Sequence, residues 1–148
     1  MQYEAPGWGV GELWLDAGRV LACSHPRPER PRPVPATGHV LAGRLSAWFA
    51  GAADDFLDVE LDVDEGFYAE LTRILRGVPH GETITYGELS ARAGRPRAAR
   101  AAGTFCARNR FAVFVPCHRV VSVDGLGGYG ELGLEYKKRL LRLEGHAV

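Results

Sequence analysis

The chain has 148 residues, of which 46% are apolar, so it can form one domain or two small domains with a buried core. It contains no apolar stretch of about eighteen residues, which predicts that no helix spans a membrane. Its first residues lack the basic flank and apolar run of a signal peptide. Three cysteines are too few for a disulfide framework, so we expect a reduced, cytoplasmic chain.

The formal net charge is zero, but the charges are segregated along the chain. Residues 54–65 carry seven acidic side chains, whereas residues 89–123 carry none. The second stretch carries seven arginines: Arg92, Arg95, Arg97, Arg100, Arg108, Arg110 and Arg119. This local excess of positive charge favours an anionic partner, although a solvated basic surface balanced by the acidic stretch accounts for the same pattern.

The first half of the chain alternates between strand and helix patterns. Residues 8–15 and 19–23 read as a strand pair joined by a turn. Five prolines in residues 26–35 predict an extended loop. Apolar residues at helical spacing then predict a helix from Leu41 to Phe49, with Thr37 as its cap.

Two further elements complete this half. Residues 58–63 alternate between acidic and apolar side chains, which predicts a strand with one wet face. Residues 67–75 form an amphipathic pattern that ends near Gly77 and Pro79, so we expect a second helix there. A turn follows at residues 80–82.

The second half contains two short helix patterns around a glycine. Thr85 and Glu88 form a capping-box pair, which predicts a helix that runs to about Ala93. Gly94 ends it, and a second helix is expected from Pro96 to about Cys106. This second helix consists almost entirely of Ala and Arg, and such a helix can approach a nucleic acid closely and contact its phosphates. The pair therefore favours a DNA-binding helix-turn-helix over a plain helical hairpin.

The last third predicts a buried strand, a chemical site and a helix. Residues 111–115 are a continuous apolar run, typical of a buried strand. Cys117 follows Pro116 and precedes His118, and an imidazole can take the proton of a thiol to give the reactive thiolate. Adjacent side chains on a strand point to opposite faces, so the two can cooperate only if the chain bends at Pro116 or a water bridges them. By spacing alone, an inert buried cysteine is the better explanation of Cys117.

A final helix is expected from Leu134 to Glu144, with Leu140, Leu141 and Leu143 on its buried face.

Several motifs at matching distances resemble the O6-alkylguanine-DNA alkyltransferases, also called methylated-DNA–protein-cysteine methyltransferases. The central motif is Pro-Cys-His-Arg-Val-Val at residues 116–121. It is accompanied by the motifs at residues 84–89, 95–103, 128–129 and 140–145, and by Asn109. The resemblance covers about residues 56–145. It implies an α+β fold, with a ribonuclease-H-like sheet-and-helix domain over residues 1–66 and a mostly helical domain with the helix-turn-helix over 67–148.

The resemblance implies a single, irreversible transfer of an alkyl group from O6 of guanine to Cys117, without a cofactor. His118 would act as the base through a water, and Glu144 would hold His118 in its useful tautomer. Tyr86 would donate a proton to N3 of the departing guanine. Asn109 would join the acceptor segment to the second helix. Arg119 fits a structural ion pair better than a catalytic contact.

The resemblance also implies that double-stranded DNA carrying alkylated guanine binds through its minor groove to a monomeric protein. Arg100 would enter the base stack and replace the flipped nucleotide. The helix would be thin enough for the groove because of Ala98, Ala99, Ala101 and Gly103, with Arg95 and Arg97 on phosphates. Val115, Gly128 and Tyr129 would line the base pocket. Acceptance of O4-alkylthymine is left open.

Three features depart from the family pattern or offer another interpretation. Arg110 replaces the usual proline, which loosens the entry to residues 111–115 or adds a phosphate contact. The glycine loop before Tyr129 is one residue short, which leaves the width of the pocket open. Cys23, His25, His39 and His80 lack the spacing of a zinc site, so we expect no metal.

The rival functions are a non-enzymatic alkyltransferase-like protein that binds damaged DNA and a Cys-His-Glu hydrolase.

Overall fold

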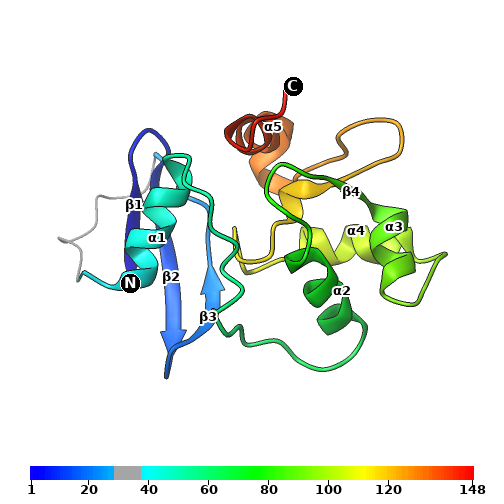
Figure 1. The fold of residues 1–148 in the computed structure, drawn as a ribbon, viewed down its shortest axis with the longest axis horizontal. Helices are drawn as coiled ribbons and strands as arrows, with labels where there is room; N and C mark the ends of the chain where they lie inside the picture. Colours follow the sequence, from blue (N-terminus) through cyan, green and yellow to red (C-terminus); the bar gives the residue numbers. More distant parts are fainter. Residues whose placement is uncertain (29–37) are drawn as a thin grey trace. The chain divides into compact units, whose positions relative to one another are not determined.

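The computed structural model describes residues 1–28 and 38–148, and it is a mixture of helices and small sheets of the α+β class (Figure 1). The chain divides into two compact units. Unit 1 comprises Met1–Asp62 and Arg110–Phe114, and unit 2 comprises Val63–Asn109 and Val115–Val148. The sequence placed the boundary after residue 66 and did not assign residues 110–114 to the first unit. The ribonuclease-H-like description of unit 1 stays a prediction.

Unit 1 is a three-stranded antiparallel sheet with one helix. The strands β1 (Gln2–Ala5), β2 (Gly9–Asp16) and β3 (Arg19–Cys23) lie in the order β1-β2-β3. The hairpin between β2 and β3 confirms the predicted strand pair. Its turn residues Ala17 and Gly18 have φ values of 49° and 82°, as a two-residue turn matched to the twist of its strands requires.

Helix α1 (Val40–Phe49) confirms the predicted helix and supplies much of the core of unit 1. Its residues Leu45, Trp48 and Phe49 are buried. The backbone N–H of Leu41 donates to Nδ1 of His39, which caps the helix at 3.1 Å. The predicted cap Thr37 and most of the predicted proline-rich loop lie outside the described residues.

The strand predicted at residues 58–63 does not form, although the alternating burial is correct for Val59 and Leu61. Instead, an isolated bridge pairs Leu61 with Val20. The N–H of Val20 donates to the carbonyl of Glu60, and the N–H of Asp62 donates to the carbonyl of Val20, both at 2.9 Å. The alternation therefore predicted which side chains are buried but not a continuous ladder.

The strand predicted at residues 111–115 is also wrong. Phe111 makes one bridge to Cys23, and the chain then turns. Val113 has a φ of 71°, and the N–H of Phe114 donates to the carbonyl of Ala112 at 2.8 Å, which closes a γ-turn. A β-branched residue at positive φ is strained, so the surrounding packing must hold this turn.

The Arg110 side chain is bonded within unit 1. Its guanidinium donates to the carbonyls of Leu21 and Asp62 and lies 4.5 Å from the ring centre of Phe111. Residues 110–111 are therefore held to β3 and to Asp62. The expectation that Arg110 in place of proline loosens the entry to residues 111–115 does not hold.

Unit 2 is mostly helical and begins with α2 (Phe67–Arg76), which confirms the predicted second helix. Helices α3 (Tyr86–Arg92) and α4 (Ala99–Ala107) follow, and the capping of α3 by Thr85 is confirmed, because Oγ1 accepts from the N–H of Glu88 at 3.1 Å. Helix α4 begins three residues later than predicted. Its first turn is preceded by a separate turn at residues 96–97.

A short parallel pair of strands brings distant segments of unit 2 together. Strand β4 (Ile84–Thr85) pairs with β5 (Val120–Val121), in the register Ile84 to Val120. This pairing sets the start of α3 beside the 3₁₀-helix η1 (Cys117–Arg119), which immediately precedes β5. Another 3₁₀-helix, η2 (Gly130–Leu132), leads into α5 (Gly133–Leu143), which confirms the predicted last helix and packs against η1. In residues 1–28 and 38–148, no helix is long and apolar enough to cross a membrane.

Candidate active site

The Cys117 thiol is placed by two consecutive features of the backbone. Pro116 has φ −80° and ψ 69°, and the N–H of Cys117 donates to the carbonyl of Val115 at 2.8 Å. This geometry is an inverse γ-turn, and η1 starts directly after it. The sequence called for a bend at Pro116 or a bridging water if Cys117 and His118 were to cooperate, and the structure has the bend. Both side chains are buried.

Asn109 ties the end of α4 to the segment before Cys117. Its side-chain Nδ2 donates to the carbonyl of Val115 at 2.9 Å, and its backbone N–H donates to the carbonyl of Cys106 at 3.2 Å. One asparagine therefore fixes the residue two positions before the thiol relative to the helix, which matches the joining role expected from the sequence.

His118, Arg119 and Glu144 form a buried network. Nε2 of His118 lies 3.0 Å from Oε1 of Glu144. Nε of Arg119 donates to Oε1 and Oε2 of Glu144 at 3.0 and 3.1 Å, and its Nη2 donates to Oε2. Nη1 of Arg119 donates to the carbonyl of Val78 at 2.7 Å. The structural ion pair expected for Arg119 is thus present, and its partner is the residue expected to orient His118.

The network sets the charge states of its members. Burial alone would raise the pKa of Glu144, but hydrogen bonds from His118 and Arg119 outweigh it and bring the pKa to about 2. Burial lowers the pKa of His118, with smaller contributions from the charges of Arg119 and Lys137, although Glu144 opposes the shift. Near neutral pH, Glu144 is therefore an anion and His118 is a neutral imidazole that can accept a proton.

The Cys117 thiol is protonated in the resting protein. Burial raises its pKa well above the ordinary value, and the neighbouring Cys106 raises it further. The charge of Lys137 and a hydrogen bond from Asn109 act in the opposite direction. A thiol in this state needs a base to remove its proton before it can act as a nucleophile.

Lys137 is a site residue that the sequence prediction missed. Its side chain on α5 is completely buried, and Nζ donates to the carbonyls of Val120, Leu126 and Gly128. Burial lowers the pKa of Lys137. Because Nζ donates to the carbonyls of Leu126 and Gly128, the ammonium anchors the glycine-rich loop (residues 125–128) that precedes Tyr129. It shares the buried face of α5 with Leu140 and Leu141 at helical spacing, and that position is the signal from which it could have been predicted.

Tyr86 and the glycine-rich loop lie against each other. A Cβ on Gly127, which has a φ of 72°, would sit 3.0 Å from the hydroxyl of Tyr86, so the loop can pass this closely only because of the glycine. Burial raises the pKa of Tyr86, and electrostatic interactions with Cys106 and Cys117 act in the same direction, so its hydroxyl keeps its proton. Tyr129 is half-buried and stacks on Tyr136, with ring centres 6.4 Å apart.

The residues that the sequence assigned to DNA lie on α4 and in the segment 95–98 that precedes it. Ala102 and Phe105 face the core, whereas Arg100 and Ala99 are exposed. The remaining predicted residues divide into exposed arginines and half-buried small residues: Arg95, Arg97, Ala98, Ala101 and Gly103. The outer face of α4 is therefore thin and carries a projecting arginine.

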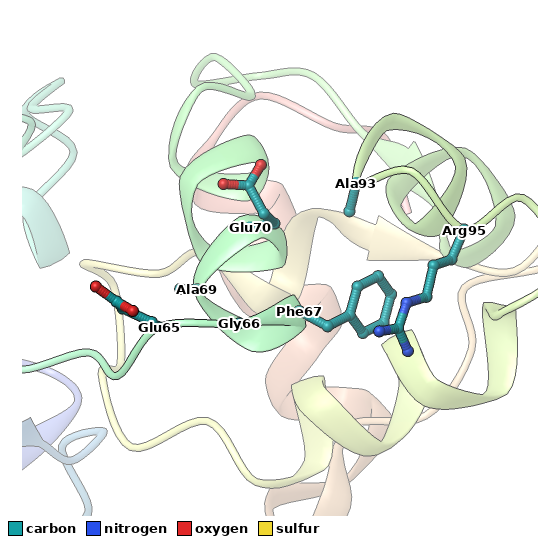
Figure 2. Close-up of a pocket in the computed structure, with 7 residues that line it drawn as sticks. All are labelled: Glu65, Gly66, Phe67, Ala69, Glu70, Ala93 and Arg95. Atoms are coloured by element: carbon teal, nitrogen blue, oxygen red, sulfur yellow. The ribbon is translucent and has the colours of Figure 1, made fainter.

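A surface cavity of about 430 Å³ lies elsewhere in unit 2, at the start of α2 (Figure 2). Figure 2 shows the Arg95 guanidinium over the ring of Phe67, and the distance to the ring centre is 4.3 Å. The cavity is lined by Glu65, Gly66, Phe67, Ala69, Glu70, Ala93 and Arg95. It includes neither Cys117 nor the predicted pocket residues. Among the residues that the structure describes, no three potential ligands are grouped to hold a metal ion.

Comparisons with known proteins agree on one family. A family model described as "6-O-methylguanine DNA methyltransferase, DNA binding domain" matches residues 66–146. The methylated-DNA–protein-cysteine methyltransferase of Methanopyrus kandleri is 42% identical over 110 residues, which cover 74% of this chain and 82% of that protein. The one of Mycolicibacterium paratuberculosis is 46% identical over 103 residues, which cover 68% of this chain and 61% of that protein, less than two thirds of its length.

Solved structures give the same result over nearly the whole chain. The Mycobacterium tuberculosis OGT in complex with DNA has a TM-score of 0.79 and 32% identity, with 97% of this chain and 90% of that chain covered. An O6-methylguanine-DNA methyltransferase from Pyrococcus kodakaraensis has a TM-score of 0.72 and 26% identity, with 99% and 98% covered. The family model matches more than half of this chain, and the Methanopyrus kandleri relative aligns with most of it, so the chain belongs to the methylated-DNA–protein-cysteine methyltransferase family.

Proposed function

We propose that this protein repairs alkylated DNA by transferring an alkyl group from O6 of guanine to the Cys117 sulfur, once per molecule and irreversibly. The observation that carries the proposal is the Cys117 thiol beside His118, a neutral buried imidazole that Glu144 contacts at 3.0 Å. Membership of the family supports the same reaction. The product is a thioether, which neither regains a thiolate nor exchanges with other thiols as a disulfide does.

The first half of the proposed reaction makes the nucleophile. His118 accepts the proton of the Cys117 thiol through an intervening water, and the resulting imidazolium is stabilised by the Glu144 carboxylate. The nearby charge of Lys137 lowers the pKa of Cys117 and therefore favours the thiolate that forms. This arrangement supplies a negative sulfur in a buried site that otherwise disfavours it.

The second half releases guanine. The thiolate attacks the alkyl carbon, a carbon–sulfur bond forms, and the carbon–oxygen bond breaks with its electrons going to the base. Tyr86, which keeps its proton because of burial, donates it to N3 of guanine. The proton taken by His118 then restores Tyr86, so the thiol proton ends on guanine. No cofactor takes part.

The proposed partner is double-stranded DNA bound through its minor groove by a monomer. In this proposal α3 and α4 act as a helix-turn-helix, and the thin face of α4 enters the groove. Arg100 fills the gap that the flipped nucleotide leaves, and Arg95 and Arg97 contact phosphates. The flipped base enters a pocket formed by Val115, Gly128 and Tyr129. Because the reaction needs a reduced thiol, we place it in the cytoplasm.

Mass spectrometry of the protein after mixing with DNA that contains O6-methylguanine tests this function. We expect one additional methyl group, located by digestion on the peptide with Cys117. The matched variants Cys106→Ser and Cys23→Ser should still gain it, whereas Cys117→Ser should not, although it should still bind the DNA. Methylation of the Cys117→Ser variant at another cysteine would reject Cys117 as the acceptor. An unchanged mass with tight DNA binding would favour the non-enzymatic alternative.

A further inference from the structure

The Glu144 carboxylate lies between two histidines, only one of which belongs to the proposed mechanism. Oε1 is 3.0 Å from Nε2 of His118, and Oε2 is 3.4 Å from Nδ1 of His80. Arg119 donates to both oxygens between them. The side chains of Glu144 and His118 are 0% and 1% exposed, whereas that of His80 is 33% exposed. Of these four side chains, His80 is the one that meets solvent.

The backbone holds His80 in this place. The N–H of Glu82 donates to the carbonyl of Pro79 at 3.1 Å, which closes a turn around His80 and Gly81. Gly81 has a φ of 84°, and a Cβ at this position would lie 3.4 Å from the carbonyl oxygen of Glu144. The residue before this turn, Val78, accepts the hydrogen bond from Arg119. The turn is thus fixed against both the end of α5 and η1.

We propose that His80 is a positioning residue that connects the buried base His118 to the pH of the solvent through Glu144. Histidine is the side chain whose charge ordinarily changes between about pH 5 and 8. While His80 is neutral, the Glu144 carboxylate is available to stabilise a proton on His118. When His80 is protonated, it adds a positive charge at the same carboxylate, and the proton on His118 becomes less favourable.

The charges around the pair determine the sign of this effect. Arg119 already neutralises Glu144, and Lys137 also disfavours a proton on His118. A protonated His80 is therefore a third positive charge, after Arg119 and Lys137, that disfavours a proton on His118. The Glu144 carboxylate is the single anion among these groups. At acidic pH, alkyl transfer should therefore be slower than it would be if only Cys117 and His118 changed their protonation. This inference rests on the proposed function, in which His118 takes the thiol proton.

The test compares transfer rates across pH for the full chain and for His80→Gln and His80→Phe, two variants without a titrating side chain. The substrate is free O6-benzylguanine, because a free base removes the pH dependence of DNA binding. His146→Gln, which removes a histidine two residues after Glu144, is the matched control. We expect the variants and the unmodified chain to react at similar rates near pH 8, and the variants to be about three to ten times faster near pH 5.5. The control should follow the unmodified chain.

A rate ratio that stays constant with pH would overturn the role of His80, because a merely structural effect of the substitution does not follow the protonation of an imidazole. Benzyl transfer to Cys117 at pH 8 in the same samples shows that the proposed function holds even in that case. If the unmodified chain transfers no benzyl group at any pH, the proposed function fails and the inference fails with it. Using both Gln and Phe separates a lost charge from lost packing.

Discussion

Replacing Glu144 by Gln removes the single negative charge that Arg119 and His118 share. The carboxylate side chain is fully buried and accepts from Nε and Nη2 of Arg119. Its pKa falls from the ordinary value of 4.5 to about 2. Each pKa unit corresponds to about 1.4 kcal/mol, so the ionised carboxylate contributes about 3 kcal/mol to the free energy of unfolding at neutral pH. Leaving Arg119 buried without its anion is a loss of the same order.

The contribution of Glu144 depends on pH in a defined direction. A carboxylate whose pKa is lowered in the folded state stabilises the fold above the unfolded-state value of 4.5. This stabilisation is lost as the pH falls through that value toward about 2. Glu144→Gln should therefore be about 3 kcal/mol less stable than the unmodified chain at pH 7, and the difference should shrink steadily at acidic pH.

Urea unfolding followed by circular dichroism at several pH values between 3 and 7 measures this difference. Glu135→Gln is the matched control, because Glu135 lies on the same helix with an 80% exposed side chain and an ion pair to Lys138. The control should change stability by less than about 0.5 kcal/mol. A loss of less than about 1 kcal/mol for Glu144→Gln at pH 7, or an equally large loss at pH 3, would show that the ionised Glu144 does not stabilise the fold in this way.

Three further predictions concern the reaction. Lys137→Met should raise the pKa of Cys117 and slow transfer at pH 7, because a nearby positive charge is lost. It should also lower the free energy of unfolding by about 1–3 kcal/mol, because the loop carbonyls lose their donor. A pH titration of thiolate absorbance tests the first effect, which an unchanged curve would contradict, and urea unfolding tests the second. Asn109→Ala should remove its bond to the Val115 carbonyl, cost about 1 kcal/mol and slow transfer to free O6-benzylguanine, measured by single-turnover kinetics; unaltered kinetics would show that this bond does not place the thiol. Arg100→Ala should slow repair of duplex DNA at least about tenfold more than reaction with the free base, since only the duplex must be unstacked; equal slowing on both substrates would assign Arg100 to the pocket.

The helices were predictable because their signals are local. The apolar spacing of α1 and α2 and the capping pair of Thr85 and Glu88 each lie within a few residues, so the sequence contains the whole cause of the element. The start of α4 was missed by three residues because Pro96 suits a turn as well as a first helical turn. The predicted strand at residues 111–115 failed for a different reason: an apolar run indicates burial and does not specify conformation.

The site was predictable where chemistry and sequence position coincide, as for Cys117, His118 and Glu144. The functions assigned to these three residues stay proposals. The structure does place His118 and Glu144 in one buried network, 3.0 Å apart. Lys137 was missed and His80 was considered only as a metal ligand, because their contacts with the loop carbonyls and with Glu144 are made only on folding. A lysine on a helix ordinarily faces solvent, and only the packing of α5 against the carbonyl groups of the glycine-rich loop buries this one.

Titrating an excess of DNA containing O6-methylguanine against a fixed amount of protein tests whether each molecule accepts one alkyl group only, on Cys117. If Cys117 is a single-use acceptor, demethylated guanine should rise to one equivalent per chain and then stop, while all the added methyl groups are found on Cys117. A continuing linear phase beyond one equivalent would mean that the protein turns over, and the irreversible transfer to Cys117 would have to be abandoned.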